Sequence, residues 1–163
     1  MIKLLRVDDR LIHGQVALTW TSFLKADTIV VGNDRCAKDA FASMALNLAK
    51  PPGVALNIVT KDDAIEFLLN QENSQRKIFV VVESTDDAVY ISEKVEEISN
   101  VILGGIRKSE EKHQIERQVF LSQHDLDNCD LLEKMGKTVH IQVVPSEKKL
   151  NLDDTKHVFN KNR

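Results

Sequence analysis

A histidine, two arginines and two aspartates lie close together in the stretch RVDDRLIHGQV, residues 6–16. A group that accepts phosphate needs a nucleophile that is unprotonated near neutral pH, an accessible position, and fixed positive charge for the phosphate oxygens. An imidazole meets the first need because its reference pKa is ~6.5. The stretch therefore predicts phosphoryl transfer with His13 as the acceptor. Chemistry alone leaves a capping or surface role for His13 open.

Three residues beside His13 are candidates for holding the phosphoryl group. The guanidinium of Arg10 can bind two phosphate oxygens at once, which a lysine ammonium cannot do. If a helix begins after His13, the backbone N–H groups of Gly14 and Gln15 have no partner within that helix and can bind an anion. We therefore expect a phosphate-binding set of Arg10, Gly14 and Gln15.

Two neighbouring carboxylates, Asp8 and Asp9, oppose a bound phosphate. Like charges ~4 Å apart repel by about 4 kcal/mol at an effective dielectric constant near 20, whereas a helix terminus contributes only ~0.3 to 2 kcal/mol. The two carboxylates cannot both face the phosphate. We expect Asp9 to point away from it and to fix Arg10 or the loop backbone, in a supporting role.

The elements on either side place this stretch at a change from strand to helix. An apolar run of strand length, residues 2–7, precedes it. After it, apolar side chains recur at helical spacing, namely Val16, Trp20, Phe23 and Leu24. The active loop is therefore expected between the first strand and the first helix. Trp20 is expected in the core rather than as a platform on which a ligand stacks.

Strand and helix patterns alternate through the next part of the chain. Strands are expected at residues 28–31, 54–59, 77–84 and 101–103, separated by helices at residues 37–50, 60–69 and 85–98. The unbroken apolar run at residues 78–82 indicates a strand buried on both faces, as in a parallel sheet covered by helices. The alternation predicts the α/β class, with a single-domain, three-layer, helix-flanked, mostly parallel sheet of about six to seven strands. Ligands of such sheets bind at the carboxyl ends of the strands.

The last third of the chain is less regular. A hairpin-like or loop-crossed edge is expected around residues 114–121, followed by a helix from the capping residue Ser122 to about Gly136. Residues 137–144 alternate apolar and polar, which indicates an outer strand with one polar face. Such an edge would permit a homo-oligomer.

A length of 163 residues suits one domain. We expect this domain over residues 1–147. The polar tail at residues 148–163 is given no structure apart from a helical turn near residues 156–159.

Charge and hydropathy narrow the classes of partner. The net charge of −3 and the spread of the basic residues along the chain argue against nucleic acid. The basic pair Arg107-Lys108 is either solvated or in contact with a partner or a phosphate. No apolar run approaches the ~20 residues of a membrane helix, and the first residues form a strand pattern rather than a signal sequence. We therefore expect a cytoplasmic protein.

The cysteines and the remaining histidines indicate no metal or disulfide chemistry. Cys36 and Cys129 lie far apart, without CxxC or Cys/His spacing, so we expect two buried apolar residues and no metal site. Four further histidines lie singly and are expected to have no catalytic role: His113, His124, His140 and His157.

Other readings of the same residues are possible. A receiver-type module would use Asp8 and Asp9 to hold magnesium, with Asp62 and Lys108 as the nearest further candidates, both awkwardly beyond their strands. A non-catalytic regulatory relative would keep the fold and bind a partner, although the retention of both His13 and Arg10 argues against it. A dinucleotide-binding domain is disfavoured because no GxGxxG follows the first strand.

The stretch also resembles a known family. The B component of the mannose/fructose/sorbose family of the phosphoenolpyruvate-dependent sugar phosphotransferase system carries a pattern close to R-[IV]-D-D-R-L-I-H-G-Q-V at its active histidine, and residues 6–16 match it throughout. Agreement extends to Trp20, the IVVGND segment at residues 29–34, Gly104-Gly105 and Val144-Pro145. The resemblance covers nearly the whole chain up to about Glu147.

This resemblance implies specific roles. His13 would be the phosphohistidine, modified at the ring nitrogen nearer the backbone, and Arg10 would bind the phosphoryl group. The donor would be a phosphohistidine on the A component, itself charged by the carrier HPr. The acceptor would be a sugar held by the membrane C and D components, with which the protein would associate peripherally. No metal, nucleotide or other cofactor is implied.

The chain departs from the family pattern at the glycine pair. An Asn-Val usually precedes the two glycines and a Met follows them, whereas this chain has Ile102, Leu103 and Ile106 at these positions. These departures bear on contacts with partners and on the choice of sugar, and leave the expected phosphotransfer unchanged.

Overall fold

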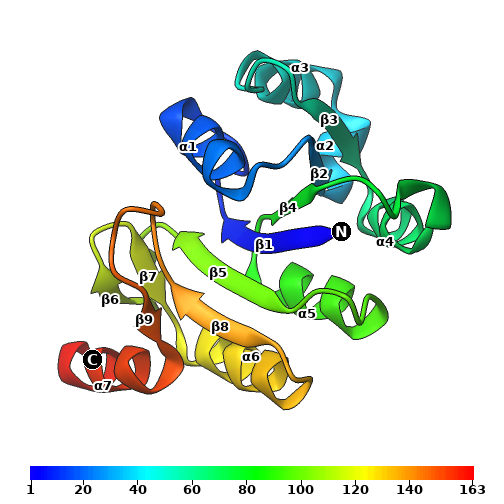
Figure 1. Ribbon diagram of the computed structural model, residues 1–163. Coiled ribbons are helices and arrows are strands. Elements are labelled where there is room, and N and C mark those ends of the chain that lie inside the picture. The colour runs from blue at the N-terminus through cyan, green and yellow to red at the C-terminus, as the bar shows by residue number, and fades with distance from the viewer.

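The protein is built around a central β-sheet (Figure 1), and the computed structural model describes residues 1–163. The strands are β1 (Ile2–Asp8), β2 (Thr28–Gly32), β3 (Ala55–Val59), β4 (Ile78–Val82), β5 (Asn100–Gly105), β6 (His113–Glu116), β7 (Val119–Leu121), β8 (Thr138–Ile141) and β9 (Leu150–Asn151). The helices are α1 (Gly14–Leu24), α2 (Asp34–Lys38), α3 (Ala40–Leu48), α4 (Lys61–Leu69), α5 (Thr85–Lys94), α6 (Gln123–Lys134) and α7 (Leu152–Asn162), with a short 3-10 helix η1 (Gln71–Asn73).

The main sheet has seven strands in the order β3-β2-β4-β1-β5-β8-β9. All neighbouring strands are parallel except β8 and β9. The first strand, β1, lies between β4 and β5 near the middle of the sheet, so the loop that leaves its carboxyl end emerges where the strand order changes direction. The predicted mostly parallel sheet is confirmed.

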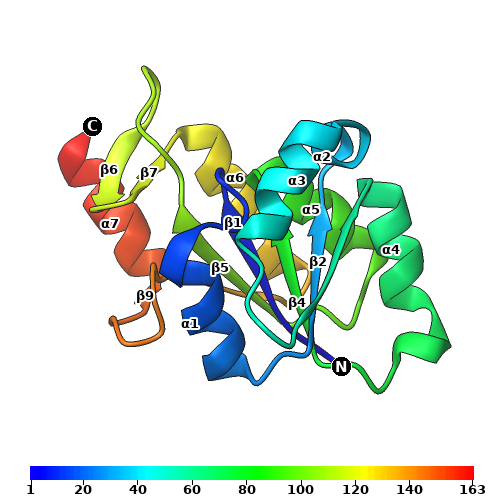
Figure 2. The ribbon, with the colours of Figure 1, turned by 90° about the horizontal axis from the view of Figure 1, so that it is seen from above.

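Helices cover both faces of the sheet, as Figures 1 and 2 show. Side chains of α4, α5, α6 and α7 form the larger core with one face, and those of α1, α2 and α3 form the smaller core with the other. Residues 78–82 of β4 are all buried and contribute to both cores in alternation. The three-layer arrangement therefore follows from strands that are apolar on both sides.

The helix expected at residues 37–50 is broken into α2 and α3. Asp39 stands at the break, where its carboxylate accepts hydrogen bonds from the backbone N–H groups of Phe41 and Ala42 and caps α3. An aspartate is a poor residue inside a helix and a good cap, so the chain restarts there. Phe41, Met44, Ala45 and Leu48 recur at helical spacing, which predicts a buried apolar face, and this prediction is wrong because Phe41 and Leu48 point to solvent.

Residues 113–121 form a small antiparallel pair, β6 with β7, in agreement with the expected hairpin. Beyond it, the chain is more ordered than the sequence suggested. Residues 148–163 form β9 and α7, a longer helix than the expected turn at residues 156–159. Leu152 and Phe159 belong to the larger core, so this segment packs with the sheet. The strand β8, expected at the outside, is flanked by β9.

Candidate active site

The candidate loop joins the end of β1 to the start of α1. Leu11 N–H donates to the carbonyl of Asp8 (2.9 Å), which folds the loop back on the strand end. Gly14, the first residue of α1, has a φ of 46°, a left-handed value that favours glycine. His13 occupies the N-cap position, but its imidazole makes no capping hydrogen bond and is 21% exposed. The capping alternative for His13 is therefore excluded.

Asp8 is the centre of the site. Its Oδ2 lies 2.8 Å from Nε2 of His13 and 3.0 Å from a guanidinium nitrogen of Arg6, and its Oδ1 accepts the backbone N–H of Arg10 at 3.0 Å. Burial acts to raise the pKa of Asp8, but the hydrogen bond to His13, the charge of Arg6 and the N–H of Arg10 together lower it. Asp8 is therefore a carboxylate at neutral pH and can only accept hydrogen bonds.

This fixes the tautomer of His13. Since the carboxylate accepts, Nε2 of the imidazole must donate, and in the neutral ring the lone pair then resides on Nδ1. Nδ1 is the nitrogen nearer the backbone. The arrangement leaves Nδ1 as the ring nitrogen with a free lone pair.

Arg6 supports Asp8 from within the protein. Its side chain is 1% exposed, and Nη1 donates to the carbonyl of Val143 at 2.9 Å. The indole N–H of Trp20 donates to the same carbonyl at 2.9 Å, and the guanidinium lies 5.6 Å from the centre of the indole ring. Burial lowers the pKa of Arg6, while the charge of Asp8 opposes this shift. The pair is thus enclosed by the first helix and by the segment after β8.

Gly104 and Gly105 provide the space for this pair. A methyl group added to Gly104 would lie 1.8 Å from Nη1 of Arg6, and one added to Gly105 would lie 2.9 Å from Oδ2 of Asp8. The pair of glycines is therefore required by the buried arginine and aspartate, since any side chain at position 104 would displace the guanidinium.

Asp9 does not act as expected on Arg10. Its Oδ2 accepts the backbone N–H of Arg107 at 2.8 Å and lies 3.1 Å from Nε of the same residue. The Arg10 backbone is held instead by Asp8. Through Arg107, Asp9 ties the active loop to the segment after β5. The correction follows from the end of β1, where successive side chains turn to opposite sides.

The side chain of Arg10 is exposed and makes no hydrogen bond or ion pair within the protein. It lines a cavity of about 190 Å³ together with Arg107, Lys108 and Arg117. Asp9 is the one acidic residue in this lining. The structure thus places the basic pair 107-108 beside Arg10. Arg117 was missed because it comes from the turn between β6 and β7, and no local pattern links it to the loop.

Gly14 and Gln15 are exposed at the start of α1, which lacks a side-chain cap. They follow His13 directly in the chain. The two residues line a cleft between α1 and α3, whereas Arg10 lines the basic cavity.

The receiver-type reading finds no support in the geometry. Asp8 contacts basic groups instead of another carboxylate, and Asp62 lies in α4, where it accepts a hydrogen bond from Tyr90 at 2.5 Å. No group of three or more histidine, cysteine or acidic side chains is arranged to hold a metal ion.

None of the helices combines the length and the apolar character that crossing a membrane requires.

The three departures from the family pattern lie inside the protein. Ile102, Leu103 and Ile106 are at most 4% exposed. Their side chains pack in the two cores, so they change the packing around the glycine pair and not the outer surface. Both cysteines and Trp20 are also buried, as predicted.

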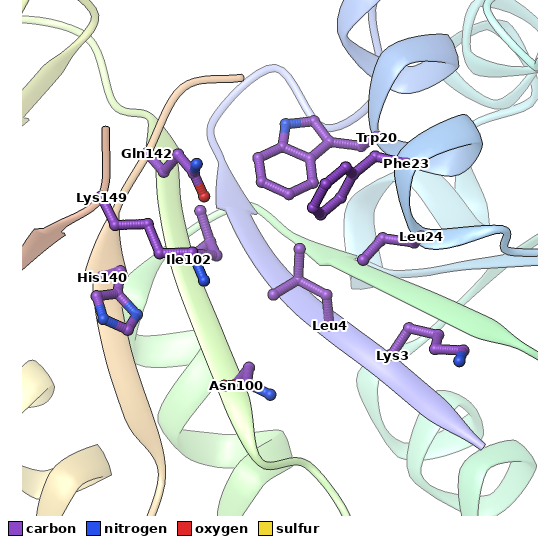
Figure 3. Close-up of a pocket in the computed structure, with 10 residues that line it drawn as sticks. All are labelled: Lys3, Leu4, Trp20, Phe23, Leu24, Asn100, Ile102, His140, Gln142 and Lys149. Atoms are coloured by element: carbon purple, nitrogen blue, oxygen red, sulfur yellow. The ribbon is translucent and has the colours of Figure 1, made fainter. Parts of the chain in front are cut away.

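A second cavity of about 170 Å³ lies on the α1 side of the sheet, over β5 and β8 (Figure 3). Phe23 and Leu24 of α1 face His140 and Lys149 across it. None of the expected site residues lines this cavity. Its wall includes Trp20, the residue whose ring lies 5.6 Å from the buried guanidinium of Arg6.

The fold and the site define an α/β protein that presents a histidine, held by a buried Arg-Asp pair, at the carboxyl edge of a mostly parallel sheet. The family model of the PTS system sorbose subfamily IIB component matches residues 2–163. The chain therefore belongs to this family, the sorbose subfamily of IIB components of the sugar phosphotransferase system.

Individual relatives agree with this membership. A probable phosphotransferase enzyme IIB component of Streptococcus pyogenes serotype M6 is 33% identical over 93% of this chain and 97% of the relative. The crystal structure of the IIBSor domain of the sorbose permease from Klebsiella pneumoniae superposes with a TM-score of 0.90 at 29% identity, covering 96% of each chain. The mannose-specific EIIAB component of Escherichia coli K12 is 29% identical over 94% of this chain, which spans 48% of that longer protein.

Proposed function

We propose that the protein accepts a phosphoryl group on Nδ1 of His13 from a phosphohistidine of an A component and passes it to a sugar. The observation that carries the proposal is the 2.8 Å contact between Nε2 of His13 and Asp8. It leaves Nδ1 with its lone pair, at a partly exposed ring. Membership of a family of phosphotransferase components supports the same chemistry.

The transfer proceeds as an in-line displacement. The lone pair of His13 Nδ1 forms a bond to phosphorus while the P–N bond of the donor phosphohistidine breaks, and the donor ring keeps the electron pair. The imidazole of His13 gains positive character as the bond forms, and the adjacent Asp8 carboxylate stabilises it. Nε2 keeps its proton throughout.

Arg10 and the N–H groups of Gly14 and Gln15 hold the phosphoryl oxygens. The free guanidinium at the loop can turn toward His13 without breaking an existing ion pair, and the uncapped start of α1 supplies dipoles of the right sign. The positive charge of the neighbouring basic cavity adds to the attraction for the donor's phosphate. Asp9 supports the loop through Arg107.

The proposed partners follow from the family. In the mannose-specific EIIAB relatives the part that this chain matches is about half of a longer protein, which supports an A component as the donor. The acceptor is a sugar bound to membrane C and D components, which meet the protein at the cytoplasmic face of the membrane. The reaction as proposed uses no metal and no nucleotide.

The test is phosphorylation of the purified protein by a phosphorylated A component, followed by treatment in acid and base. A phosphohistidine is lost in acid and persists in base. His13→Ala is expected to take up no label, and His157→Ala, which changes an unpaired histidine of α7, is expected to label as the parent does. Phosphorus and nitrogen NMR of the labelled protein should assign the bond to Nδ1. Labelling that persists in His13→Ala would overturn the proposal.

A further inference from the structure

Four large apolar side chains gather on one side of the molecule. Phe41, Met44 and Leu48 of α3 are 77%, 56% and 85% exposed, and their spacing puts them on a single face of that helix. Leu18 of the neighbouring α1 is 40% exposed. Scattered apolar side chains are normal on a protein surface, whereas a contiguous group marks an interaction site. These four residues are called the α3 patch.

The α3 patch reaches the active loop. An open cleft of about 490 Å³ between α1 and α3 is lined by Leu18 and Leu48 from the patch and by Gly14 and Gln15. Gly14 follows His13 directly in the chain. Any macromolecule that brings a phosphoryl group to Nδ1 of His13 must cover the surface immediately around the loop, and the α3 patch is one flank of that surface.

The chemistry of the patch selects a protein as the occupant. The α3 sequence AFASMALNL contains no charged residue, and Lys50 is the one charged residue that lines the cleft. A helix that binds anionic lipid head groups carries several cations beside its apolar face, and α3 lacks them. An uncharged apolar helix face fits a complementary apolar groove on another protein.

We propose that the α3 patch is the docking surface for the A component that phosphorylates His13. The proposal rests on the function proposed above and names where its donor binds. A donor must associate and leave in every cycle, and a small patch with four apolar side chains suits such a transient interface. The basic cavity, which is lined by Asp9 and Arg10 of the same loop, then borders the same interface.

The experiment compares two routes to the same phosphohistidine. In the first, a phosphorylated A component is the donor. In the second, phosphoramidate is the donor: its P–N bond breaks as the bond to Nδ1 forms, and the leaving nitrogen takes a proton from water and departs as ammonia. The second route needs no docking surface, so it reports on His13 alone.

The variant is the double substitution Phe41→Gln with Leu48→Gln, on exposed side chains whose loss leaves the cores intact. Leu131→Gln on α6, on the opposite face of the sheet and 44% exposed, is the matched control. We expect the double variant to raise KM for the A component about tenfold with kcat unchanged, because removing anchor residues weakens association. Leu131→Gln should keep the parent KM and kcat. The parent, the double variant and the control should react equally with phosphoramidate and unfold at the same temperature.

An unchanged KM for the A component in the double variant would overturn the docking proposal. If phosphorylation of sugar by membranes that contain the C and D components is slower in that variant, the patch belongs to the acceptor instead. Failure of His13 to label by either route in the parent protein would instead remove the proposed function, so the two failures are distinct.

Discussion

Asp8 and His13 form a 2.8 Å hydrogen bond in which the carboxylate is buried and the imidazole is partly exposed. The carboxylate is anchored by Arg6 and by the Arg10 backbone, so it fixes the ring through Nε2 and leaves Nδ1 without a hydrogen bond to the protein. The same contact selects the tautomer, and in the proposed transfer it stabilises the charge that develops on the ring.

Asp8→Asn should leave the loop in place and slow the phosphorylation of His13 on the order of 10²- to 10⁴-fold. An amide can donate to Nε2, which favours the tautomer with the proton on Nδ1 and removes the nucleophilic lone pair. The rate of labelling by phosphoramidate or by the A component measures the effect. Asp9→Asn is the matched control and should retain the parent rate within a few-fold. Equal rates in Asp8→Asn and the parent would contradict the assigned role of Asp8.

Gly104→Ala should lower both stability and transfer. The added methyl would overlap Nη1 of Arg6, and forcing extra volume into a packed site costs about 1–3 kcal/mol in free energy of unfolding. Gly32→Ala is the control, since its methyl would meet Ile91 at 3.1 Å in the core instead of the buried arginine. Denaturant unfolding should show that both variants are less stable than the parent. Labelling of the folded proteins should be slower in Gly104→Ala alone.

Arg10→Lys should slow transfer about tenfold while part of the phosphate affinity remains. The ammonium keeps the charge, but it cannot bind two oxygens at once. Arg10→Ala should be slower still, and neither variant should change stability, because the parent side chain has no partner within the protein. Arg76→Lys, in the loop after η1, is the control. Transfer at the parent rate in Arg10→Lys would show that Arg10 does not hold the phosphoryl group.

The two thiols should be unreactive in the folded protein. Burial raises the pKa of Cys129 to about 12, with further contributions from Asp125 and Asp130, and burial also raises the pKa of Cys36. The thiolate is the reactive form. Iodoacetamide near pH 8 should therefore modify neither residue until denaturant unfolds the chain, after which mass spectrometry should find both modified. Rapid modification of native protein would disagree with the buried positions.

The contact between α5 and α6 should stabilise the fold more at low pH. His124 Nε2 lies 2.7 Å from Oδ1 of Asp86, and this hydrogen bond and the charge of the carboxylate raise the pKa of His124. Protonation is thus favoured in the folded state, so the stabilisation is complete below the unfolded pKa of ~6.5 and is lost as the pH rises through the folded pKa.

The measurement is the difference in melting temperature between the parent and His124→Gln. It should be larger near pH 5.5 than near pH 8.5. His157→Gln, in a histidine without a partner, should show no such dependence. The same difference at both pH values would contradict the assignment.

Local patterns predicted the position of the loop well, because an apolar run and a helical repeat meet at His13. They did not reveal the role of Arg6, whose partner Val143 is far away in the sequence. One signal was available for Asp8: residues two apart in a strand share a face, so Arg6 and Asp8 had to lie on the same side of β1. The pairing of Asp9 with Arg107 depends on a neighbouring loop that no local pattern identifies.

The fold, too, could be predicted from the sequence only in part. The central strands were predictable because they are apolar throughout, whereas the break at Asp39 depended on a single capping residue within an apolar repeat. The last helix also had a signal, since Asn151 caps α7 by accepting the N–H of Asp154. Its core contacts come from only a few residues, such as Phe159 against His113, and so its apolar repeat is weak.

The two-residue strand β9 has a consequence for how the chain behaves in concentrated solution. It pairs with β8 at His140 and Ile141 and occupies hydrogen-bonding groups that would otherwise be free at that edge of the sheet. An uncovered strand edge is a template on which further chains can add. A chain cut after Glu147 would lose this cover together with α7, and its sheet edge would be open to aggregation.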